Sequence, residues 1–360
     1  MIVIIGAGIA GLSLGYELIK LGIKVTILEK AKIASGASGV ATSYLEPRLG
    51  NTAMRAIESE SMRRWEDYAN ELESRSGLKI GFNRDGQIKV TLRENIRHFK
   101  KDLAARVRQE ALFEQLSSKS LQALEPSLSG DIIDAIYLPE VRWVTGHMVC
   151  KALAEIIENS YGQIIEGCEV TGIESSPSGL GIKTSRDETF NAEKLILCTG
   201  FGASLIKDLP DDVPQSRAVR GVNLVLDQSG LTHPLTHLIK HHRGNMCPRE
   251  NSQLIVGTTY ESDQTSLQVD EDVVEFLYSN AEPILPSVRQ MPLLKVTAGL
   301  RSKVGDGNLR LGQSKAQPGL YYSLSHGGAG YLRAPVIASE LARFVLDNEP
   351  GELTKHHTSQ

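Results

Sequence analysis

The sequence predicts an α/β fold in which a parallel sheet flanked by helices is interleaved with a second, α+β part built on a largely antiparallel sheet. Three features predict this class. The first 29 residues alternate strand, helix and strand around closely spaced glycines, and residues 192–206 form another strand followed by a small-residue turn. Residues 219–262 hold several short strands separated by turn residues. A length of 360 residues suits one large domain or two interleaved ones.

The N-terminal unit begins with an apolar run, Ile2 to Ile5, typical of a buried parallel strand. Gly6, Gly8 and Gly11 follow in G-x-G-x-x-G spacing, and residues 12–21 then have helical periodicity. The first glycine permits a tight turn, the second lets backbone approach a pyrophosphate, and the third lets helix and strand pack closely. The N-terminus of such a helix offers free N–H groups and partial positive charge to phosphates.

A second apolar strand, "KVTILE", ends at Glu29, which lies 18 residues after Gly11. An acid about 20 residues beyond the glycines binds the ribose hydroxyls in dinucleotide-binding folds. G-x-G-x-x-G alone is a loose pattern, but here strand, glycines, helix, second strand and terminal acid occur in order. The unit therefore predicts a Rossmann-like dinucleotide site.

Composition and charge exclude some classes of partner. With Lys+Arg 39 against Asp+Glu 43, the net charge of -4 gives no global basic field for nucleic acid or an anionic membrane. The apolar N-terminal stretch has no basic region before it and is interrupted by glycines, which does not fit a signal peptide. No run of about 18 apolar residues exists, so we expect a cytoplasmic protein with no transmembrane segment.

The cysteines and histidines do not predict a disulfide or a metal site. The four cysteines are scattered without CxxC spacing and indicate reduced thiols. The histidines at 233, 237 and 241 would line one face of a helix, but Pro234 and the alternating pattern favour a strand, which disperses them. No G-x-S-x-G nucleophile elbow is present.

Three further segments favour a flavin over a nicotinamide. They are "IASGASGVATSYLEPRLG" at 33–50, "AEKLILCTGFGASLI" at 192–206, and "HGGAGYL" at 326–332. Small residues recur in each of them, which lets backbone lie against an extended cofactor at several points along its length.

At these residues the sequence resembles the D-amino-acid oxidase-like flavoprotein family, which includes glycine oxidase, sarcosine oxidase and D-amino-acid dehydrogenases. The matching motifs occur in the family's order over most of the chain: GAGIAG with Glu29-Lys30, GASG, CEVTGIE at 168–174, the CTG turn, GLR at 299–301, and HGGAG. The resemblance implies an FAD bound in extended form. Family members that tether FAD use a cysteine near the C-terminal glycines, and no cysteine follows Cys247, so we expect non-covalent FAD.

By matching position, the resemblance assigns the phosphate loop, the adenosine contacts, the segment along the pyrophosphate and flavin, and the C-terminal glycine loop. The cofactor residues so implied are Gly6, Gly8, Ile9, Ala10, Gly11, Glu29, Lys30, Gly36, Ala37, Ser38, Ala41, Thr42, Ser43, Val170, Thr199, Gly200, Arg301, His326, Gly327, Gly328, Ala329, Gly330, Tyr331 and Leu332. The loop "HGGAGYL" would wrap the pyrimidine edge of the flavin, with a helix at 334–346 pointing its N-terminus there. Backbone N–H groups and a helix dipole at that edge would stabilise the reduced anion.

The resemblance also divides the chain into an FAD-binding domain (1–75, 145–215 and 295–360) and a substrate-binding domain (76–144 and 216–294). The active site would lie in the crevice between flavin and sheet. Arg301 matches the family's arginine that pairs with a substrate carboxylate, since a guanidinium binds a carboxylate bidentately. Tyr260, Tyr44 and Arg48 are further candidates for the substrate pocket. No residue is assigned as catalytic acid or base, because hydride transfer from an amine needs alignment more than a base.

These features predict an FAD-dependent amino-acid or amine oxidase or dehydrogenase. It would oxidise the C–N bond of a small amino acid or secondary amine by hydride transfer to flavin N5, and the resulting imine would hydrolyse. Oxygen, a quinone or another acceptor would then take the electrons. Two alternatives stay open: oxidation of a carboxymethylaminomethyl-uridine in tRNA, since residues 36–50 and 327–342 also resemble the flavin domain of the wobble-uridine enzyme, and a non-enzymatic flavin-binding protein. The net charge of -4 lacks the basic balance of a tRNA binder.

Overall fold

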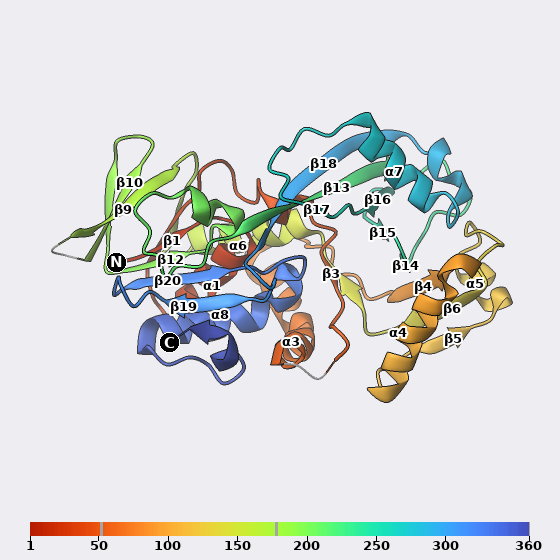
Figure 1. Ribbon diagram of the computed structural model, residues 1–360, viewed down its shortest axis with the longest axis horizontal. Coiled ribbons are helices and arrows are strands. Elements are labelled where there is room, and N and C mark those ends of the chain that lie inside the picture. Colours follow the sequence, from red (N-terminus) through yellow and green to blue (C-terminus); the bar gives the residue numbers. More distant parts are fainter. Residues whose placement is uncertain (51–52, 177–178, 360) are drawn as a thin grey trace.

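The computed structural model describes residues 1–50, 53–176 and 179–359, which form two lobes side by side (Figure 1). Both chain termini lie in the first lobe, which is an α/β unit; the second is built on a large mixed sheet. The predicted α/β class with an interleaved α+β part is confirmed. The charged, helix-patterned residues 51–76 contain helix α3 (Ala53–Ser76), and residues 51 and 52 lie outside the described part.

The first lobe is organised around a seven-stranded, mostly parallel sheet. In spatial order its strands are β21 (Thr358–Ser359), β19 (Arg310–Gln313), β20 (Leu320–Leu324), β12 (Lys194–Leu197), β1 (Ile2–Ile5), β2 (Val25–Leu28) and β8 (Gln163–Ile165). β1 pairs in parallel with both β12 and β2. The chain leaves β1 toward β2 on one side and later adds β12 on the other, so the strand order reverses at β1. Ligands of open α/β sheets bind at such a switch point, beyond the carboxyl ends of the strands.

This sheet is covered on both faces, which explains why its strands are apolar without alternation. One face packs on four helices: α1 (Ile9–Lys20), α3, α6 (Gly146–Glu158) and α8 (Gly330–Asp347). The other face packs on a three-stranded antiparallel sheet of β9 (Val170–Ser176), β10 (Gly179–Thr184) and β11 (Thr189–Ala192). α8 begins at Gly330, four residues before the predicted helix, so its N-terminus lies at the glycine loop itself.

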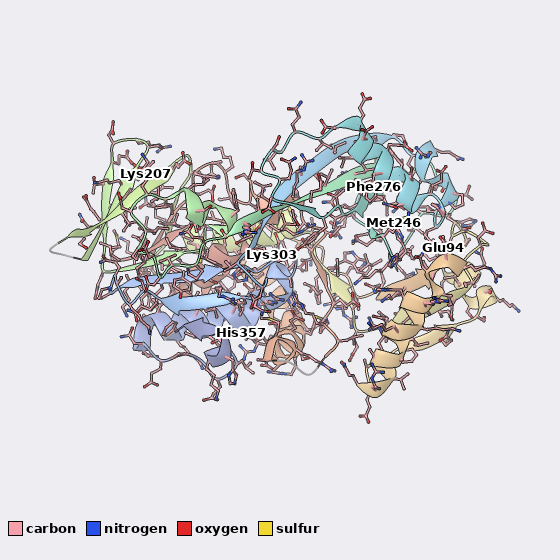
Figure 2. All side chains as sticks on the ribbon, viewed as in Figure 1. Glu94, Lys207, Met246, Phe276, Lys303 and His357 are labelled. Atoms are coloured by element: carbon pink, nitrogen blue, oxygen red, sulfur yellow. The ribbon has the colours of Figure 1, made fainter. Side chains whose placement is uncertain are left out.

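The second lobe holds a nine-stranded sheet that is antiparallel except where β14 pairs with β4. In spatial order its strands are β17 (Glu261–Ser262), β13 (Arg217–Asp227), β16 (Gln253–Gly257), β15 (Gly244–Pro248), β14 (Leu238–His241), β4 (Gln87–Thr91), β6 (Asp134–Leu138) and β5 (Glu114–Leu116), with β18 (Leu293–Lys303) also paired to β13. The predicted boundary at residue 295 falls inside β18, which pairs with β13 over nearly its whole length. This long pair joins the lobes, and Lys303 at its end is marked in Figure 2.

The two faces of the large sheet have different partners. One packs against α7 (Glu271–Ala281) in an apolar core that includes Met246, while Phe276 of α7 is exposed on the outer side (Figure 2). The other face is covered in part by α4 (Ile96–Arg108) and in part by α2 (Ala37–Val40) and the segment that follows it. That segment includes β3 (Tyr44–Leu45), which pairs with β7 (Arg142–Trp143). Residues 37–46 therefore run between the two lobes.

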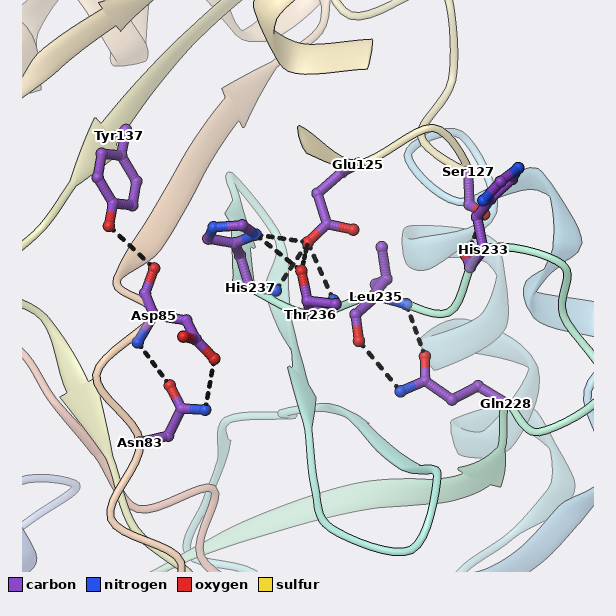
Figure 3. Close-up of polar contacts among 10 residues, drawn as sticks. All are labelled: Asn83, Asp85, Glu125, Ser127, Tyr137, Gln228, His233, Leu235, Thr236 and His237. Atoms are coloured by element: carbon purple, nitrogen blue, oxygen red, sulfur yellow. Dashed lines mark hydrogen bonds and ion pairs between the residues drawn. The ribbon is translucent and has the colours of Figure 1, made fainter. Parts of the chain in front are cut away.

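A polar cluster fixes the end of α5 (Ser118–Leu124) to the start of β14. The fully buried carboxylate of Glu125 accepts hydrogen bonds from the backbone N–H groups of Thr236 and His237, at 3.0 and 2.7 Å, and lies 2.7 Å from Nδ1 of His237 (Figure 3). Nearby, the side-chain amide of Gln228 pairs with both the N–H and the carbonyl of Leu235. These contacts order the loop before β14 and occupy His237 structurally.

Candidate functional site

The phosphate loop has the close approaches that its glycines predict. Gly6 has φ +103°, and a Cβ there would lie 2.6 Å from the carbonyl oxygen of Cys198, the residue after β12. A Cβ on Gly11 would lie 2.0 Å from the carbonyl oxygen of Gly6. Both positions exclude a side chain, because real Cβ contacts do not approach so closely. The loop and the N-terminus of α1 are thereby set at the switch point between β1 and β12.

The GASG segment crosses the start of α1. The N–H of Ile9 donates a hydrogen bond of 3.0 Å to the hydroxyl of Ser38 in α2, and Gly8 packs against that hydroxyl. Gly8, Ile9 and Ser38, predicted separately from two segments, are thus brought together. Tyr331 at the start of α8 also reaches this place, donating a 2.7 Å hydrogen bond to the carbonyl of Ser38.

Glu29 lies at the end of β2 beside the phosphate loop. Its buried carboxylate accepts hydrogen bonds from the N–H groups of Ala7 at 2.8 Å and Ala31 at 2.9 Å. The backbone carbonyl of Glu29 accepts from the N–H of Cys168 at 2.8 Å, which brings Val170 at the start of β9 to the same edge. Lys30 is exposed next to this cluster. The three positions predicted for the adenosine end therefore lie at one edge of the parallel sheet.

Open space and unpartnered polar atoms at the predicted flavin positions fit an extended dinucleotide. A Cβ added at Gly36, Gly200, Gly327 or Gly328 would meet no described atom within 4 Å. The hydroxyl of Thr199 and Nδ1 of His326 are buried without a hydrogen-bond partner among the described residues. His326 is held by Ser323, 2.9 Å from Nε2, and burial lowers the pKa of its imidazole to about 4. After Thr199, the predicted small-residue turn is a short 3₁₀ helix (Gly200–Leu205).

The glycine loop is supported by a buried ion pair that the sequence analysis missed. Arg333, in the first turns of α8, donates hydrogen bonds of 2.9 and 2.7 Å to Glu58 of α3, and both side chains are almost fully buried. Arg333 also donates to the carbonyl of His326 at 3.2 Å. Arg48, predicted for the substrate pocket, pairs with Glu58, with its Nε 3.3 Å away and its side chain half exposed. A lone arginine within the apolar run "GYLRAPVIA" is the signal that marks Arg333.

Arg301 projects from β18 on the face of the large sheet that looks toward the GASG segment. Its guanidinium lies over Gly221 of β13, where an added Cβ would come within 2.3 Å of Nη2. It donates to the carbonyl of Thr259 at 3.2 Å and to the hydroxyl of Thr258 at 2.9 Å. Among the residues that the structure describes, no carboxylate lies within ion-pair distance of it. Burial lowers the pKa of Arg301, although the guanidinium stays cationic at neutral pH.

Two of the other three substrate candidates lie beside Arg301. The phenols of Tyr44 and Tyr260 are close enough to raise the pKa of Arg301, whereas burial lowers it. Tyr260 is 64% exposed, so it is not part of the sheet core. Tyr44 packs under the ammonium of Lys240, which lies 5.0 Å from the ring centroid.

A buried charge network behind Tyr44 was also missed. Lys240 pairs with Glu46, Glu46 with Arg106 at 2.7 Å, and Arg106 with Asp102 at 3.0 Å. Asp102 in turn pairs with Lys89 at 2.7 Å. Burial opposes ionisation of Glu46, but Lys240 and Arg106 outweigh it and hold the pKa of that carboxyl below its usual range. Only the fold brings these residues from four segments together.

Several other features lie outside this site. A cavity of about 490 Å³ opens between α3 and residues 248–250, and its lining includes Trp143 and Arg249 but none of the predicted substrate residues. Within the described ranges, no group of three or more His, Cys, Asp or Glu side chains could hold a metal ion. The four cysteines are free and buried, and no helix in the described chain is both long and apolar enough to cross a membrane.

The fold and the site define the class of protein as a flavoprotein oxidoreductase with a dinucleotide lobe and a substrate lobe. The family model for FAD-dependent oxidoreductases matches residues 1–344, and the chain belongs to this D-amino-acid oxidase-like family. It is an FAD-dependent enzyme of the amino-acid or amine oxidase or dehydrogenase type, which confirms the predicted cofactor and enzyme class.

Individual relatives are distant in sequence but match over nearly the whole chain. Glycine oxidase from Bacillus licheniformis is 26% identical over 351 residues, covering 96% of this chain and 93% of the relative. The crystal structure of glycine oxidase from Geobacillus kaustophilus superposes with a TM-score of 0.91 at 23% identity, covering 100% of this chain and 98% of that one. An L-alpha-glycerophosphate oxidase from Mycoplasma pneumoniae with FAD bound has the same fold, with a TM-score of 0.83 at 20% identity over 96% of this chain and 94% of that one.

Proposed function

We propose that the protein oxidises the C–N bond of a small amino acid or secondary amine, giving an imine that water hydrolyses. The observation that carries this proposal is the half-buried guanidinium of Arg301, which has only neutral oxygen partners among the described residues. A buried cation without a counter-ion is costly, so it favours an anionic ligand. Two of the similar proteins are named glycine oxidase, which supports a small amino acid as that ligand.

In this proposal, Arg301 binds the substrate carboxylate through two parallel hydrogen bonds and fixes the α-carbon in the crevice between the lobes. Tyr44 and Tyr260 border the same place and limit the size of the side chain that fits. The amine reacts in its unprotonated form, so no side chain need act as base. Bound FAD would supply the hydride acceptor at N5 and then pass the electrons to oxygen, a quinone or another acceptor.

The glycine loop and the start of α8 would hold the flavin's pyrimidine edge. The N–H groups there and the helix dipole favour negative charge at that edge, which raises the driving force for reduction. Attachment is non-covalent in this proposal. The cysteine near the loop is Cys150, 3.3 Å from the Tyr331 hydroxyl, and burial raises the pKa of its thiol to about 12, so it is a poor nucleophile.

An anaerobic flavin-bleaching screen on the FAD-loaded protein tests the proposal. Glycine, sarcosine, D-amino acids, proline and carboxymethylaminomethyl-uridine are added in turn while the flavin band near ~450 nm is followed. We expect a small amino acid to bleach the band, and readmission of air then separates an oxidase from a dehydrogenase. Bleaching only by the modified nucleoside would support the tRNA alternative, and bleaching by none of these amines would overturn the proposed function.

A further inference from the structure

Asn223 has a buried side-chain amide on the side of the large sheet where we expect the flavin. It lies in β13, two residues beyond Gly221, and is only 3% exposed. Its Nδ2 donates a 2.8 Å hydrogen bond to the carbonyl of Val40 at the end of α2. This bond sets the orientation of the amide, because the flipped amide would place two oxygens against each other. Oδ1 is then left buried with no partner among the described residues.

The position of that oxygen depends on a glycine in the next strand. Gly257 of β16 stands opposite Asn223, and an added Cβ there would lie 2.0 Å from Oδ1. The oxygen therefore occupies the space over Gly257 that any other residue would fill. On the far side of Gly257, the paired residue of β15 is Asn245, whose Oδ1 is also buried and has no partner in the described part of the chain. Two free acceptors thus flank one glycine on the same face of the sheet.

Arg301 lies on the same face of the sheet, and its distance from the Asn223 oxygen suits one small ligand between them. Its guanidinium covers Gly221, and the Asn223 oxygen covers Gly257, which is the diagonal cross-strand neighbour of Gly221. Such diagonal neighbours are about 7–8 Å apart. The amine of an α-amino acid lies about 3 Å from its carboxylate oxygens. With a hydrogen bond of about 2.9 Å at each end, the distance from the guanidinium to the amide oxygen is nearly 9 Å at most, and it is shorter when the arrangement is bent. One α-amino acid therefore fits between the guanidinium and the amide oxygens.

We propose that Asn223 and Asn245 accept hydrogen bonds from the substrate's amino group, so that the site selects amines on the carbon next to a carboxylate. An unpaired buried acceptor is costly, and an N–H donor removes that cost. An amino group with two hydrogens, or a secondary ammonium, satisfies both oxygens at once. This inference rests on the proposed function. In that function Arg301 binds the substrate carboxylate, and here Asn223 and Asn245 also bind the substrate amine.

The test compares ligands that differ only in the amine. Glycine is compared with its isostere propionate, and sarcosine with its isostere butyrate, under anaerobic conditions on the FAD-loaded protein. The dissociation constant of each amine is taken from the concentration dependence of the flavin-reduction rate, and that of each amine-free acid from the shift of the visible flavin spectrum. Asn223→Leu removes the acceptor while keeping the volume. We expect it to weaken glycine and sarcosine about tenfold, the value of one buried hydrogen bond, and to leave propionate and butyrate within about twofold. β-Alanine, whose amine is one carbon further away, should bind the wild type more weakly than glycine.

A matched control separates this effect from loss of folding. Asn280→Leu removes another buried amide of the same lobe, on α7 at the opposite face of the sheet, and should alter neither class of ligand. FAD content and unfolding midpoints are measured for both variants. Equal losses for amine and amine-free ligands, or no loss for either in Asn223→Leu, would overturn the inference while the wild type's reduction by an amine still upholds the proposed function. A wild type that no amine reduces would overturn the proposed function first.

Discussion

The guanidinium of Arg301 rests on the bare backbone of Gly221, its diagonal neighbour across the β13–β18 pair. Any side chain at position 221 would occupy the space of the guanidinium, since its Cβ would lie within 2.3 to 2.7 Å of three guanidinium atoms. The direction of the cation is therefore set by a glycine on the neighbouring strand.

Gly221→Ala should displace Arg301 and weaken carboxylate binding. We expect KM for the amino-acid substrate to rise about tenfold or more, the cost of one charge-assisted hydrogen bond, with FAD still bound. Steady-state kinetics and the flavin spectrum provide the measurement. Gly230→Ala is the control, because an added Cβ there meets nothing within 4 Å. Unchanged KM in Gly221→Ala would contradict the placement of the guanidinium.

Arg301→Ala should raise KM strongly while FAD stays bound, because the substrate carboxylate loses its cation. Arg301→Lys should recover only part of the loss, since an ammonium does not bind a carboxylate bidentately. The control is Arg289→Ala, in which the lost arginine pairs with Glu275 and Glu282 at the surface of the same lobe. Wild-type kinetics in Arg301→Ala would remove this residue from the site.

Gly6→Ala should impair FAD binding. The φ of +103° and the 2.6 Å approach to the Cys198 carbonyl force the loop to shift, which misplaces the N-terminus of α1. We expect the FAD dissociation constant to rise at least about tenfold, measured by titration of the apoprotein. Gly130→Ala, at a position with open space, should bind FAD like the wild type. Normal affinity in Gly6→Ala would argue against this loop as the pyrophosphate site.

Glu58→Gln should destabilise the fold. Glu58 and Arg333 are 0% and 1% exposed, so the variant leaves a buried guanidinium without its counter-charge. Breaking such a pair typically costs about 3–5 kcal/mol, measurable by urea unfolding. Glu60→Gln on the same helix is the control, because its partners Arg63 and Arg64 are 70% and 36% exposed and the loss should stay below about 1 kcal/mol. A similarly small loss in Glu58→Gln would contradict a stabilising role for this buried ion pair.

Glu46 should make stability depend on pH below neutrality. Because Lys240 and Arg106 hold its pKa below the usual value in the folded state, the folded protein binds fewer protons than the unfolded chain. The stabilisation is therefore present above the unfolded pKa, about 4.5, and is lost as pH falls through the lower folded value. Unfolding free energies at pH 6 and pH 4 should differ less in Glu46→Gln than in the wild type. An unchanged difference would mean that other carboxyls cause the acid sensitivity.

The phosphate-loop half of the site was predictable from sequence because its determinants are local. The glycine spacing around Gly6, the strand before it and Glu29 after the second strand lie within one βαβ unit, and the physics of tight turns and helix N-termini applies directly. The order of further small-residue motifs, ending in the glycine loop at 326–330, extended this to a flavin. The tertiary structure adds that Gly8 and Ser38 meet at the start of α1.

The substrate half depended on tertiary structure. Arg48, near Tyr44 in sequence, turns to Glu58, because a buried carboxylate beside Arg333 attracts it. In the sequence, Asn223 is one polar residue in an apolar strand. Only the tertiary structure sets it opposite Gly257 and leaves its oxygen without a partner among the described residues. The sequence by itself determined the fold class, the family and the cofactor, since these follow from short-range patterns. Which side chains surround the proposed substrate site was decided by strand register and lobe packing, which join residues far apart in the chain and leave no local pattern.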